Sequence, residues 1–194
     1  MKTYIKANST EYDCYGNELT YQQSAFFQNS KIRDGRGRLL VCYHSTSADF
    51  DTFDKQRIGS GFGGSFGAGI YFATDKSYAS VYGNKVLECY LNIVNPFDYM
   101  QYGTNKLVID LMQKEGYKFN PEDVQNCSEM YSEDAYDIVE ILYDNGYSSL
   151  DFSKCLMNAG YDGINIDSEI VAFEPNQIKA ISNKNPTSSD NIHT

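Results

Sequence analysis

The sequence predicts an α+β fold, and three observations support this prediction. Short apolar runs of strand length, such as Leu39–Tyr43 and Ile170–Phe173, lie on both sides of the middle of the chain. Helix-period apolar patterns concentrate between about residues 105 and 160. No segment repeats at a fixed period, so a solenoid or propeller is not expected. Strands, then a block of helices, then strands again are the order of an α+β domain.

Size and charge narrow the class of protein. The chain has 194 residues, of which 41% are hydrophobic, and this suits one globular domain with its own core. The formal net charge of -10 would repel a phosphate backbone, so a nucleic-acid partner is disfavoured. The sequence shows neither a signal-peptide pattern nor an apolar run of membrane-spanning length. We therefore expect a soluble cytoplasmic protein without a membrane partner, and a monomer by default.

The cysteines form neither a metal-binding nor a disulfide pattern. They stand at positions 14, 42, 89, 127 and 155, an odd number without a CxxC pair or histidines at metal-ligand spacing. We therefore expect reduced, mostly buried thiols and no metal.

The first predicted strand follows a polar extension. Residues 1–29 are polar and contain one helical patch around Gln22–Phe27. A glycine-marked turn then leads into Leu39–Tyr43, an apolar run of strand length. His44 would lie at or just past the end of this strand, a position where sites are often built.

A glycine-rich loop precedes the second predicted strand. Gly59–Gly69 contains six glycines in eleven residues, a composition that lets backbone approach a ligand closely. The loop leads into the strand Ile70–Ala73, which carries Tyr71. Ser77–Tyr82 is then predicted to be a short helix with Thr74 or Asp75 as its N-cap, so that Tyr71 and Tyr82 could converge across a strand-to-helix corner.

The rest of the chain gives further strand and helix patterns. Apolar residues alternate with Glu88, Tyr90 and Asn92, which predicts a half-buried strand. Two helical stripes end at Asn145-Gly146 and at Gly160. Glu169 directly precedes the last predicted strand, and residues 182–194 are predicted to be a disordered polar tail.

Single residues do not decide the chemistry. His44 is the one histidine outside the tail, so imidazole chemistry would fall to it. Each candidate also has a structural interpretation, since a strand-end histidine is more often a hydrogen-bonding scaffold residue and tyrosines often fill a core. Their combination and spacing favour a functional site.

Three segments resemble the signature regions of a known enzyme class. They are LLVCYHST, FGAGIYFATDKSYASVYG and SEIVAFEPNQIKAI. Together they resemble the H-Y-E class of ADP-ribosyltransferases, which includes diphtheria-type toxins and poly(ADP-ribose) polymerases. The nearest likeness is to the transferase domains of phage and mobile-element polyvalent proteins. It covers residues 30–181, which leaves 1–29 as an extension and 182–194 as a tail.

The resemblance implies a fold, a co-substrate and an activity. The fold would be two packed, mainly antiparallel sheets that form a cleft for NAD, with flanking helices. The activity would cleave the nicotinamide–ribose bond and transfer ADP-ribose to a macromolecular acceptor, a protein in preference to nucleic acid. The biological setting implied is a bacterial or phage effector or toxin.

The resemblance also implies a role for each site residue. Glu169, His44 and Tyr71 match the catalytic residues, and Tyr82 matches the second tyrosine. His44 would hydrogen bond the adenosine ribose, the Ser45 backbone would hold the nicotinamide carboxamide, and the two tyrosines would enclose the nicotinamide ring. Glu169 would bind the nicotinamide-ribose hydroxyl. The residues expected along NAD are His44, Ser45, Thr46, Arg57, Gly69, Tyr71, Phe72 and Tyr82.

The chemistry agrees with these roles. Loss of nicotinamide leaves an oxocarbenium-like cation that a nearby carboxylate stabilises electrostatically. Nicotinamide leaves as a neutral molecule, so no general acid is required. Arg57, beside the glycine-rich loop, is a candidate contact for the pyrophosphate.

Two departures from the family pattern leave alternatives open. Ser45 stands where the family usually has glycine, and its Cβ could narrow the nicotinamide pocket. Asp167 stands two residues before Glu169 in place of a glutamate, so arginine-directed transfer is not expected. The alternatives are an NAD glycohydrolase, a catalytically silent NAD- or ADP-ribose-binding module and, less favoured, a cysteine hydrolase that pairs Cys42 with His44. A related-fold RNA phosphotransferase is disfavoured because few basic residues are available.

Overall fold

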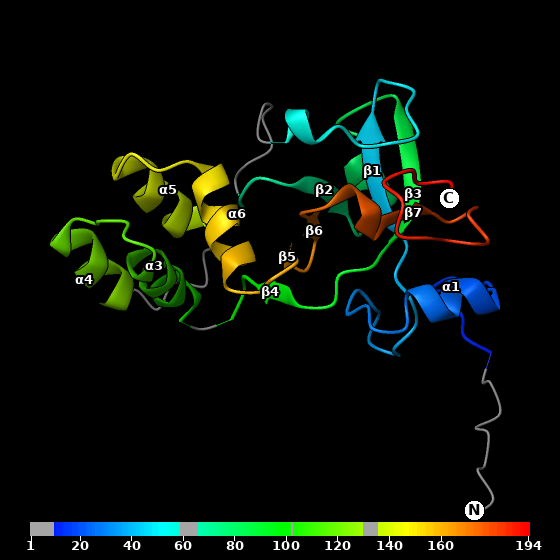
Figure 1. Ribbon diagram of the computed structural model, residues 1–194, viewed down its shortest axis with the longest axis horizontal. Helices are drawn as coiled ribbons and strands as arrows, with labels where there is room; N and C mark the ends of the chain where they lie inside the picture. Colours follow the sequence, from blue (N-terminus) through cyan, green and yellow to red (C-terminus); the bar gives the residue numbers. More distant parts are fainter. Residues whose placement is uncertain (1–9, 59–65, 102, 130–135) are drawn as a thin grey trace, which may run out of the picture.

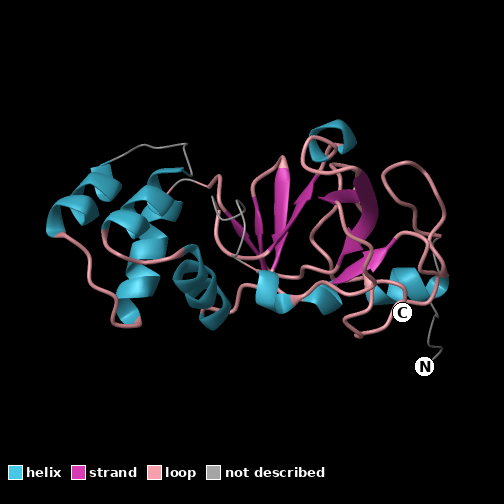
Figure 2. Ribbon diagram, turned by 90° about the horizontal axis from the view of Figure 1, so that it is seen from above, coloured by secondary structure: helices cyan, strands magenta, loops and turns pink. Residues whose placement is uncertain are grey.

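The fold is known from a computed structural model, which describes residues 10–58, 66–101, 103–129 and 136–194 (Figure 1). Most of the glycine-rich loop, residues 59–65, lies outside the described residues. Helix α1 and the C-terminal end lie at the same end of the molecule, and a group of helices occupies the other end (Figures 1 and 2).

The described strands form a seven-stranded sheet of mixed direction. Its order is β4-β5-β6-β2-β1-β3-β7, and every neighbouring pair is antiparallel except the parallel pair β4 and β5. The strands are β1 (Cys42–Thr46), β2 (Ile70–Ala73), β3 (Lys85–Leu91), β4 (Pro96–Asp98), β5 (Gly163–Asn165), β6 (Glu169–Ala172) and β7 (Ile178–Ala180). The α+β class is confirmed. The expectation of two separate packed sheets is not confirmed. The β1–β2 pairing joins all the described strands into a single sheet.

The junction between β1 and β2 is the narrowest pairing in the sheet. Among the described residues these strands pair at one position, Tyr43 with Ala73, whereas β1 and β3 pair at five positions, Cys42 to Thr46. The sheet therefore opens on one side of the Tyr43–Ala73 pair, and the residues that follow Tyr43 and precede Ala73 face this opening.

The central stretch of the chain forms helices, as the sequence predicts. The α-helices are α1 (Tyr21–Phe26), α2 (Lys76–Ala79), α3 (Thr104–Lys114), α4 (Pro121–Glu129), α5 (Tyr136–Asp144) and α6 (Ser149–Asn158), and short 3-10 turns η1 (Lys55–Arg57) and η2 (Pro175–Gln177) accompany them. Helices α3 to α6 gather at one end of the molecule (Figure 2). Buried Ile138, Leu142 and Phe152 of this bundle pack with Ile164 and Val171 of the sheet.

β1 is displaced along the sequence from the predicted strand. It begins at Cys42 and continues to Thr46, because β3 pairs with it along that whole length. His44 therefore lies inside the strand and not at its end. The sequence misplaced the boundary because polar residues continue the strand once a partner strand supplies its hydrogen bonds.

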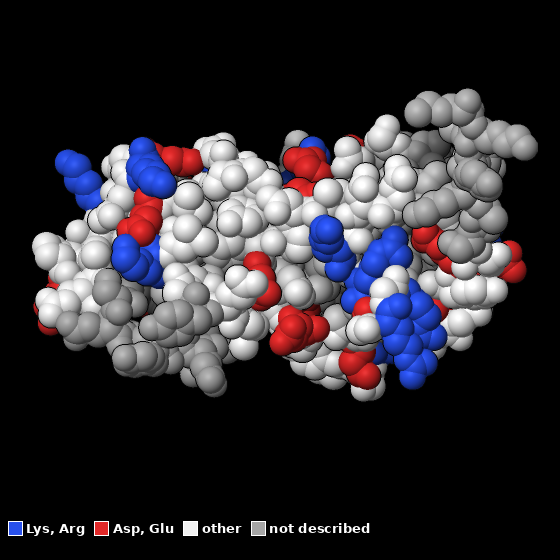
Figure 3. Space-filling model, turned by 90° about the horizontal axis from the view of Figure 1, so that it is seen from below, with Lys and Arg blue, Asp and Glu red and all other residues white. Residues whose placement is uncertain are grey.

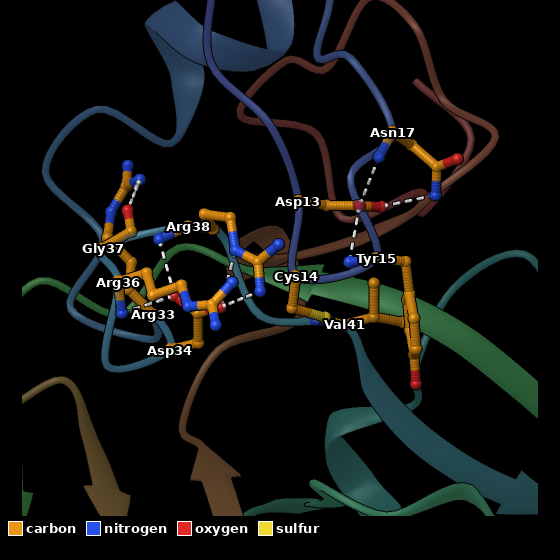
Figure 4. Close-up of polar contacts among 10 residues, drawn as sticks. All are labelled: Asp13, Cys14, Tyr15, Asn17, Arg33, Asp34, Arg36, Gly37, Arg38 and Val41. Carbon is orange, nitrogen blue, oxygen red and sulfur yellow. Dashed lines mark hydrogen bonds and ion pairs between the residues drawn. The ribbon is translucent and has the colours of Figure 1, made fainter.

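The N-terminal segment covers part of the sheet that the sequence predicts to be exposed. Tyr90 of β3 was expected on the polar face of a half-buried strand, but its side chain is buried against Phe27. The Tyr90 hydroxyl donates to the carboxylate of the fully buried Asp13, 2.9 Å away. The same carboxylate accepts from the backbone N–H groups of Tyr15 and Asn17, so it organises this segment (Figure 4).

The C-terminal residues, predicted to be a disordered tail, lie against the sheet. Ile192 is buried among the core residues behind β2 and β7, and its backbone N–H donates to the carbonyl of Asp51 at 2.8 Å. The buried ammonium of Lys179 donates to the carbonyls of Ser189 and Asn191. The polar composition of the tail predicts disorder because it does not reveal these contacts. One apolar side chain, Ile192, and backbone hydrogen bonds attach the tail to the sheet.

Basic and acidic side chains are interspersed on the face drawn in Figure 3, where lysines and arginines gather mainly on the sheet-bearing half. Within the described parts of the chain, no helix is long and apolar enough to cross a bilayer. Cys42, Cys89 and Cys155 are buried free thiols, as the cysteine pattern predicts, and Cys14 is half-buried.

Candidate functional site

A cavity of about 710 Å³ opens where β1 and β2 separate. This volume lies in the range of about 300–1,000 Å³ that is typical of small-molecule sites. Its lining comes from β1, the segment 48–58, the end of the glycine-rich loop, β2, α2 and the first residue of β6. All the residues predicted for the site contribute to this lining: His44, Ser45, Thr46, Arg57, Gly69, Tyr71, Phe72, Tyr82 and Glu169.

His44 closes the gap between the two strands. Its Nδ1 lies 2.8 Å from the backbone carbonyl oxygen of Tyr71. Because a carbonyl oxygen only accepts, Nδ1 carries the proton, and Nε2 of the neutral ring is then an acceptor. Burial lowers the pKa of His44, although the hydrogen bond to Tyr71 opposes this effect. The imidazole is therefore neutral at pH 7, with a fixed tautomer.

Three phenylalanines hold the His44 ring, and only Phe72 of these is among the residues predicted to line the NAD site. The Phe53 and Phe72 rings lie 4.9 and 5.5 Å from the imidazole centroid, and the Phe50 ring lies at 6.4 Å. Phe72, which was expected to contact NAD, thus also supports His44 from behind. The spacing of Phe50 and Phe53 in the FDTF turn was the available signal for the other two.

Tyr71 is held by the end of the glycine-rich loop. Its hydroxyl donates to the carbonyl of Gly67 at 2.5 Å and accepts from the backbone N–H of Phe66 at 3.2 Å. Burial raises the pKa of the Tyr71 hydroxyl. Since both ends of the side chain are fixed, the ring forms a rigid wall of the cavity.

Gly69 is required by packing between strands. A Cβ at this position would lie 2.2 Å from Cγ1 of Val171 and 2.9 Å from the carbonyl oxygen of Ala172. The missing side chain therefore permits the close approach of β2 to β6. The glycine was predicted as a ligand contact, and its position in the cavity wall follows from this packing.

Tyr78 in α2 and Tyr82 just after the helix both lie at the rim of the cavity, since α2 ends at Ala79 and not at the predicted Tyr82. Asp75 caps the helix, since its carboxylate accepts from the Tyr78 backbone N–H at 2.9 Å. The Tyr82 hydroxyl donates to the Tyr78 hydroxyl at 3.1 Å, and the two rings meet edge to face. Tyr82 is 67% exposed, so it stands at the rim and is not buried in the core. The one-turn spacing of the two tyrosines was visible in the sequence, but the site prediction left Tyr78 out.

Glu169 enters the cavity from the neighbouring strand. It begins β6 and pairs with Ala73, so strand alternation puts it on the same face of the sheet as Tyr71. Partial burial raises the pKa of Glu169, and the neighbouring Tyr78 hydroxyl opposes that rise. The carboxylate thus combines access to the cavity with reduced solvation.

Ser45 does not strain the strand that carries it. The residue lies in the regular part of β1, paired with Val86, and its hydroxyl donates to the Lys85 carbonyl at 3.3 Å. A glycine is therefore not needed at this position for backbone reasons. Gly83 packs closely against the adjacent Thr46. A Cβ added to Gly83 would lie only 2.8 Å from the backbone nitrogen of Thr46.

Arg57 is the one lysine or arginine among the described residues that line the cavity. Its side chain is largely exposed, and its Nε lies 3.7 Å from the Asp54 carboxylate. Asp49, Asp54 and Glu169 also line the cavity, so its described wall carries more acidic than basic groups.

Two other sequence candidates lie outside the cavity lining. Cys42 is fully buried, and burial raises the pKa of its thiol, which removes the thiolate that a cysteine nucleophile needs. The cysteine hydrolase alternative is therefore not supported. Asp167 is exposed in the turn before β6, with φ of 56°, and takes no part in the wall.

A model of the family described as "ADP-Ribosyltransferase in polyvalent proteins" matches residues 34–188. The chain belongs to this family of ADP-ribosyltransferases. The matched span contains every residue that lines the cavity and all seven strands, and it begins after α1. The resemblance to the transferase domains of polyvalent proteins is thereby confirmed.

Two further comparisons add no function to this ADP-ribosyltransferase domain. None of the curated proteins compared with the chain matches it. Among solved structures, the chain is similar to one described as "Crystal structure of an anti-CRISPR protein", with 11% identity and a TM-score of 0.36. That similarity covers 69% of this chain and 88% of the other, and a TM-score this low carries no argument.

Proposed function

We propose that the chain is an NAD-dependent ADP-ribosyltransferase of the H-Y-E type. The observation that carries the proposal is the convergence of His44, Tyr71, Tyr82 and Glu169 on one cavity. These residues come from three strands and the segment that follows a helix, and their sequence positions span more than half of the chain. The family to which the chain belongs supports the same activity.

The groups around the cavity suit the adenosine and nicotinamide ends of NAD. A neutral His44 with its Nδ1 proton committed to Tyr71 offers Nε2 as an acceptor for a ribose hydroxyl. The fixed ring of Tyr71 and the exposed ring of Tyr82 provide aromatic surfaces for the nicotinamide. Arg57 is the cation that would meet the pyrophosphate.

Glu169 would stabilise the charge that develops during the reaction. The bond between nicotinamide and ribose breaks, nicotinamide takes the bonding electrons, and the ribose carbon becomes cationic. A carboxylate held in a poorly solvated position interacts with such a cation more strongly than one in water. The acceptor then bonds to this carbon and loses a proton to solvent. The proposed acceptor is a protein, because the chain carries a formal charge of -10.

The geometry at Ser45 favours an active site over a silent binding module. The sequence predicts that the Ser45 Cβ could narrow the nicotinamide pocket, but Ser45 lies in regular strand structure and its hydroxyl is bonded to the Lys85 carbonyl. The effector or toxin setting is part of the proposal and depends on the acceptor that is found.

The test is incubation with NAD labelled in the adenylate part, in the presence and absence of a bacterial lysate. We expect nicotinamide release together with label in macromolecules that protease removes. Label that appears only as free ADP-ribose would identify an NAD glycohydrolase. No nicotinamide release, with NAD binding intact, would identify a silent binding module and contradict the proposal.

A further inference from the structure

A segment outside the sheet forms one wall of the cavity. Residues 48–58, which we call the cavity wall segment, supply Phe50, Phe53 and Arg57 to the lining. The two phenylalanine rings lie 4.8 Å apart, and both meet the imidazole of His44 edge to face. None of the seven described strands runs through this segment. Its position therefore depends on contacts from elsewhere in the chain.

The backbone near the C-terminal end supplies such a contact. Ile192 donates its N–H to the carbonyl of Asp51 at 2.8 Å, and its own carbonyl accepts from the N–H of Ala180 in β7 at 3.0 Å. Residues 189–192, which we call the C-terminal strap, thus connect the edge strand β7 to the cavity wall segment. The attachment point lies between the two phenylalanines that hold His44.

The side chain of Ile192 makes a second connection to the cavity. It is 1% exposed and belongs to the same buried cluster as Phe53 and Phe72, the phenylalanines whose rings lie closest to the His44 imidazole. The strap therefore closes the side of this cluster that faces away from the cavity.

Lys179 anchors the strap to β7. Its ammonium is buried and donates to the carbonyl of Ser189 and, at 2.9 Å, to the carbonyl of Asn191. A buried ammonium requires acceptors, so these bonds hold the strap in place. Asn191 in turn forms an antiparallel bridge with Thr52 of the cavity wall segment. The strap is thus fixed on one side to the sheet and on the other side to the wall.

We propose that the C-terminal strap positions the cavity wall segment for NAD, with Ile192 as the positioning residue and Lys179 as its anchor. The bond from Ile192 to Asp51 sets the place of the two phenylalanines, and they set the place of His44. This inference deepens the proposed function and rests on it. The strap lies beyond residues 34–188, which match the family, so the family does not supply this role.

The first test measures the cavity wall segment without NAD. Ile192→Ala removes the buried side chain that holds the strap against the core. Hydrogen–deuterium exchange would be read by mass spectrometry on peptides within residues 48–58. We expect exchange there to quicken roughly ten-fold, while β2 and β6 keep the parental rates. Parental exchange in the cavity wall segment of Ile192→Ala would overturn the proposal.

The second test measures NAD binding and turnover. If Ile192→Ala leaves the wall correctly placed about a tenth of the time, the apparent Kd for NAD rises about ten-fold. Bound NAD selects the correctly placed wall, so KM should rise and kcat should stay within about two-fold of the parent. A lower kcat with an unchanged Kd for NAD would contradict a positioning role in binding.

A matched variant separates positioning from a general loss of stability. Ile109→Ala removes the same side chain, also 1% exposed, from α3 in the helix bundle. It should lower the Tm but change neither exchange in the cavity wall segment nor the Kd for NAD. Equal effects of Ile109→Ala and Ile192→Ala on both measurements would overturn the proposal.

A second strap variant covers the case in which Ile192→Ala does not fold. Lys179→Met keeps the apolar stem and removes the bonds to the strap. Since a buried ammonium is costly to desolvate, its loss should leave the Tm nearly unchanged and still raise wall exchange and the Kd for NAD. Parental values of both would overturn the proposal. If the parent binds no NAD, the proposed function fails, while the exchange measurement still decides the role of the strap.

Discussion

The Nδ1 atom of His44 donates to the backbone carbonyl of Tyr71, 2.8 Å away, across the point where β1 and β2 separate. A side chain thus takes the place of a strand-to-strand hydrogen bond at the mouth of the cavity. The bond fixes the imidazole tautomer and joins two of the residues on which the proposed activity depends.

Removal of this imidazole should weaken NAD binding as well as turnover. His44→Ala removes the proposed acceptor for the ribose and leaves the Tyr71 carbonyl without its partner. We expect the Kd for NAD to rise roughly ten-fold, as measured by calorimetry. His193→Ala is the matched control, since His193 is exposed and lies outside the cavity lining. Equal NAD affinity of His44→Ala and the parent would remove His44 from the binding site.

Replacement of Glu169 by Gln should separate catalysis from binding. Gln keeps the size of the side chain but loses the charge that faces the developing cation. We expect turnover to fall by roughly two to four orders of magnitude with NAD affinity nearly unchanged. Nicotinamide release at the parental rate would show that Glu169 is not catalytic.

The same substitution should not destabilise the fold. Partial burial raises the pKa of Glu169, so the folded state favours the protonated carboxyl and loses stability as pH rises through that pKa. Glu169→Gln should therefore have an equal or higher Tm at pH 7. The difference should vanish below about pH 4, where the carboxyl of the parent is protonated in both states. A lower Tm at pH 7 would contradict this account.

The pH dependence of kcat and of KM should distinguish the Glu169 carboxyl from the His44 imidazole. The raised pKa of Glu169 places the acid limb of kcat above the ordinary glutamate value of about 4.3. The lowered pKa of His44 means that NAD affinity, reported by KM, should fall only when pH drops below about 6.5. Protonation converts Nε2 from acceptor to donor and also destabilises the fold at acid pH. The affinity change should be absent in His44→Ala.

Gly83 offers a test of how tightly the strand beside the cavity is packed. A Cβ at this position would lie within 2.9 Å of three backbone atoms of Thr46, so Gly83→Ala must displace the end of β1. We expect KM for NAD to rise several-fold with a smaller change in kcat. Gly35→Ala is the control, because a Cβ there would meet no atom within 4 Å. Parental kinetics for Gly83→Ala would show that Thr46 can move without consequence.

The sequence by itself determined the class of fold, the helical block in the middle of the chain and the identity of the candidate residues, but it did not predict β4 or β7. Local patterns were sufficient for the helical block and for β2 and β6, because helix-period apolar residues and apolar runs bounded by turns are encoded within a few residues. The spacing between Tyr71 and Tyr82 corresponds to a strand that carries Tyr71, a short helix that ends at Ala79, and a following bend that carries Tyr82.

Only the tertiary structure decided which of these residues contact one another and which are buried. The length of β1 depends on β3, and the burial of Tyr90 depends on Asp13 and Phe27 from a polar-looking segment. The hydrogen bond from the backbone N–H of Thr74 to the carbonyl of Ser168 joins distant parts of the chain. A sequence pattern records the preference of each residue for a local geometry, whereas these contacts arise when sheet pairing brings remote segments within hydrogen-bonding distance.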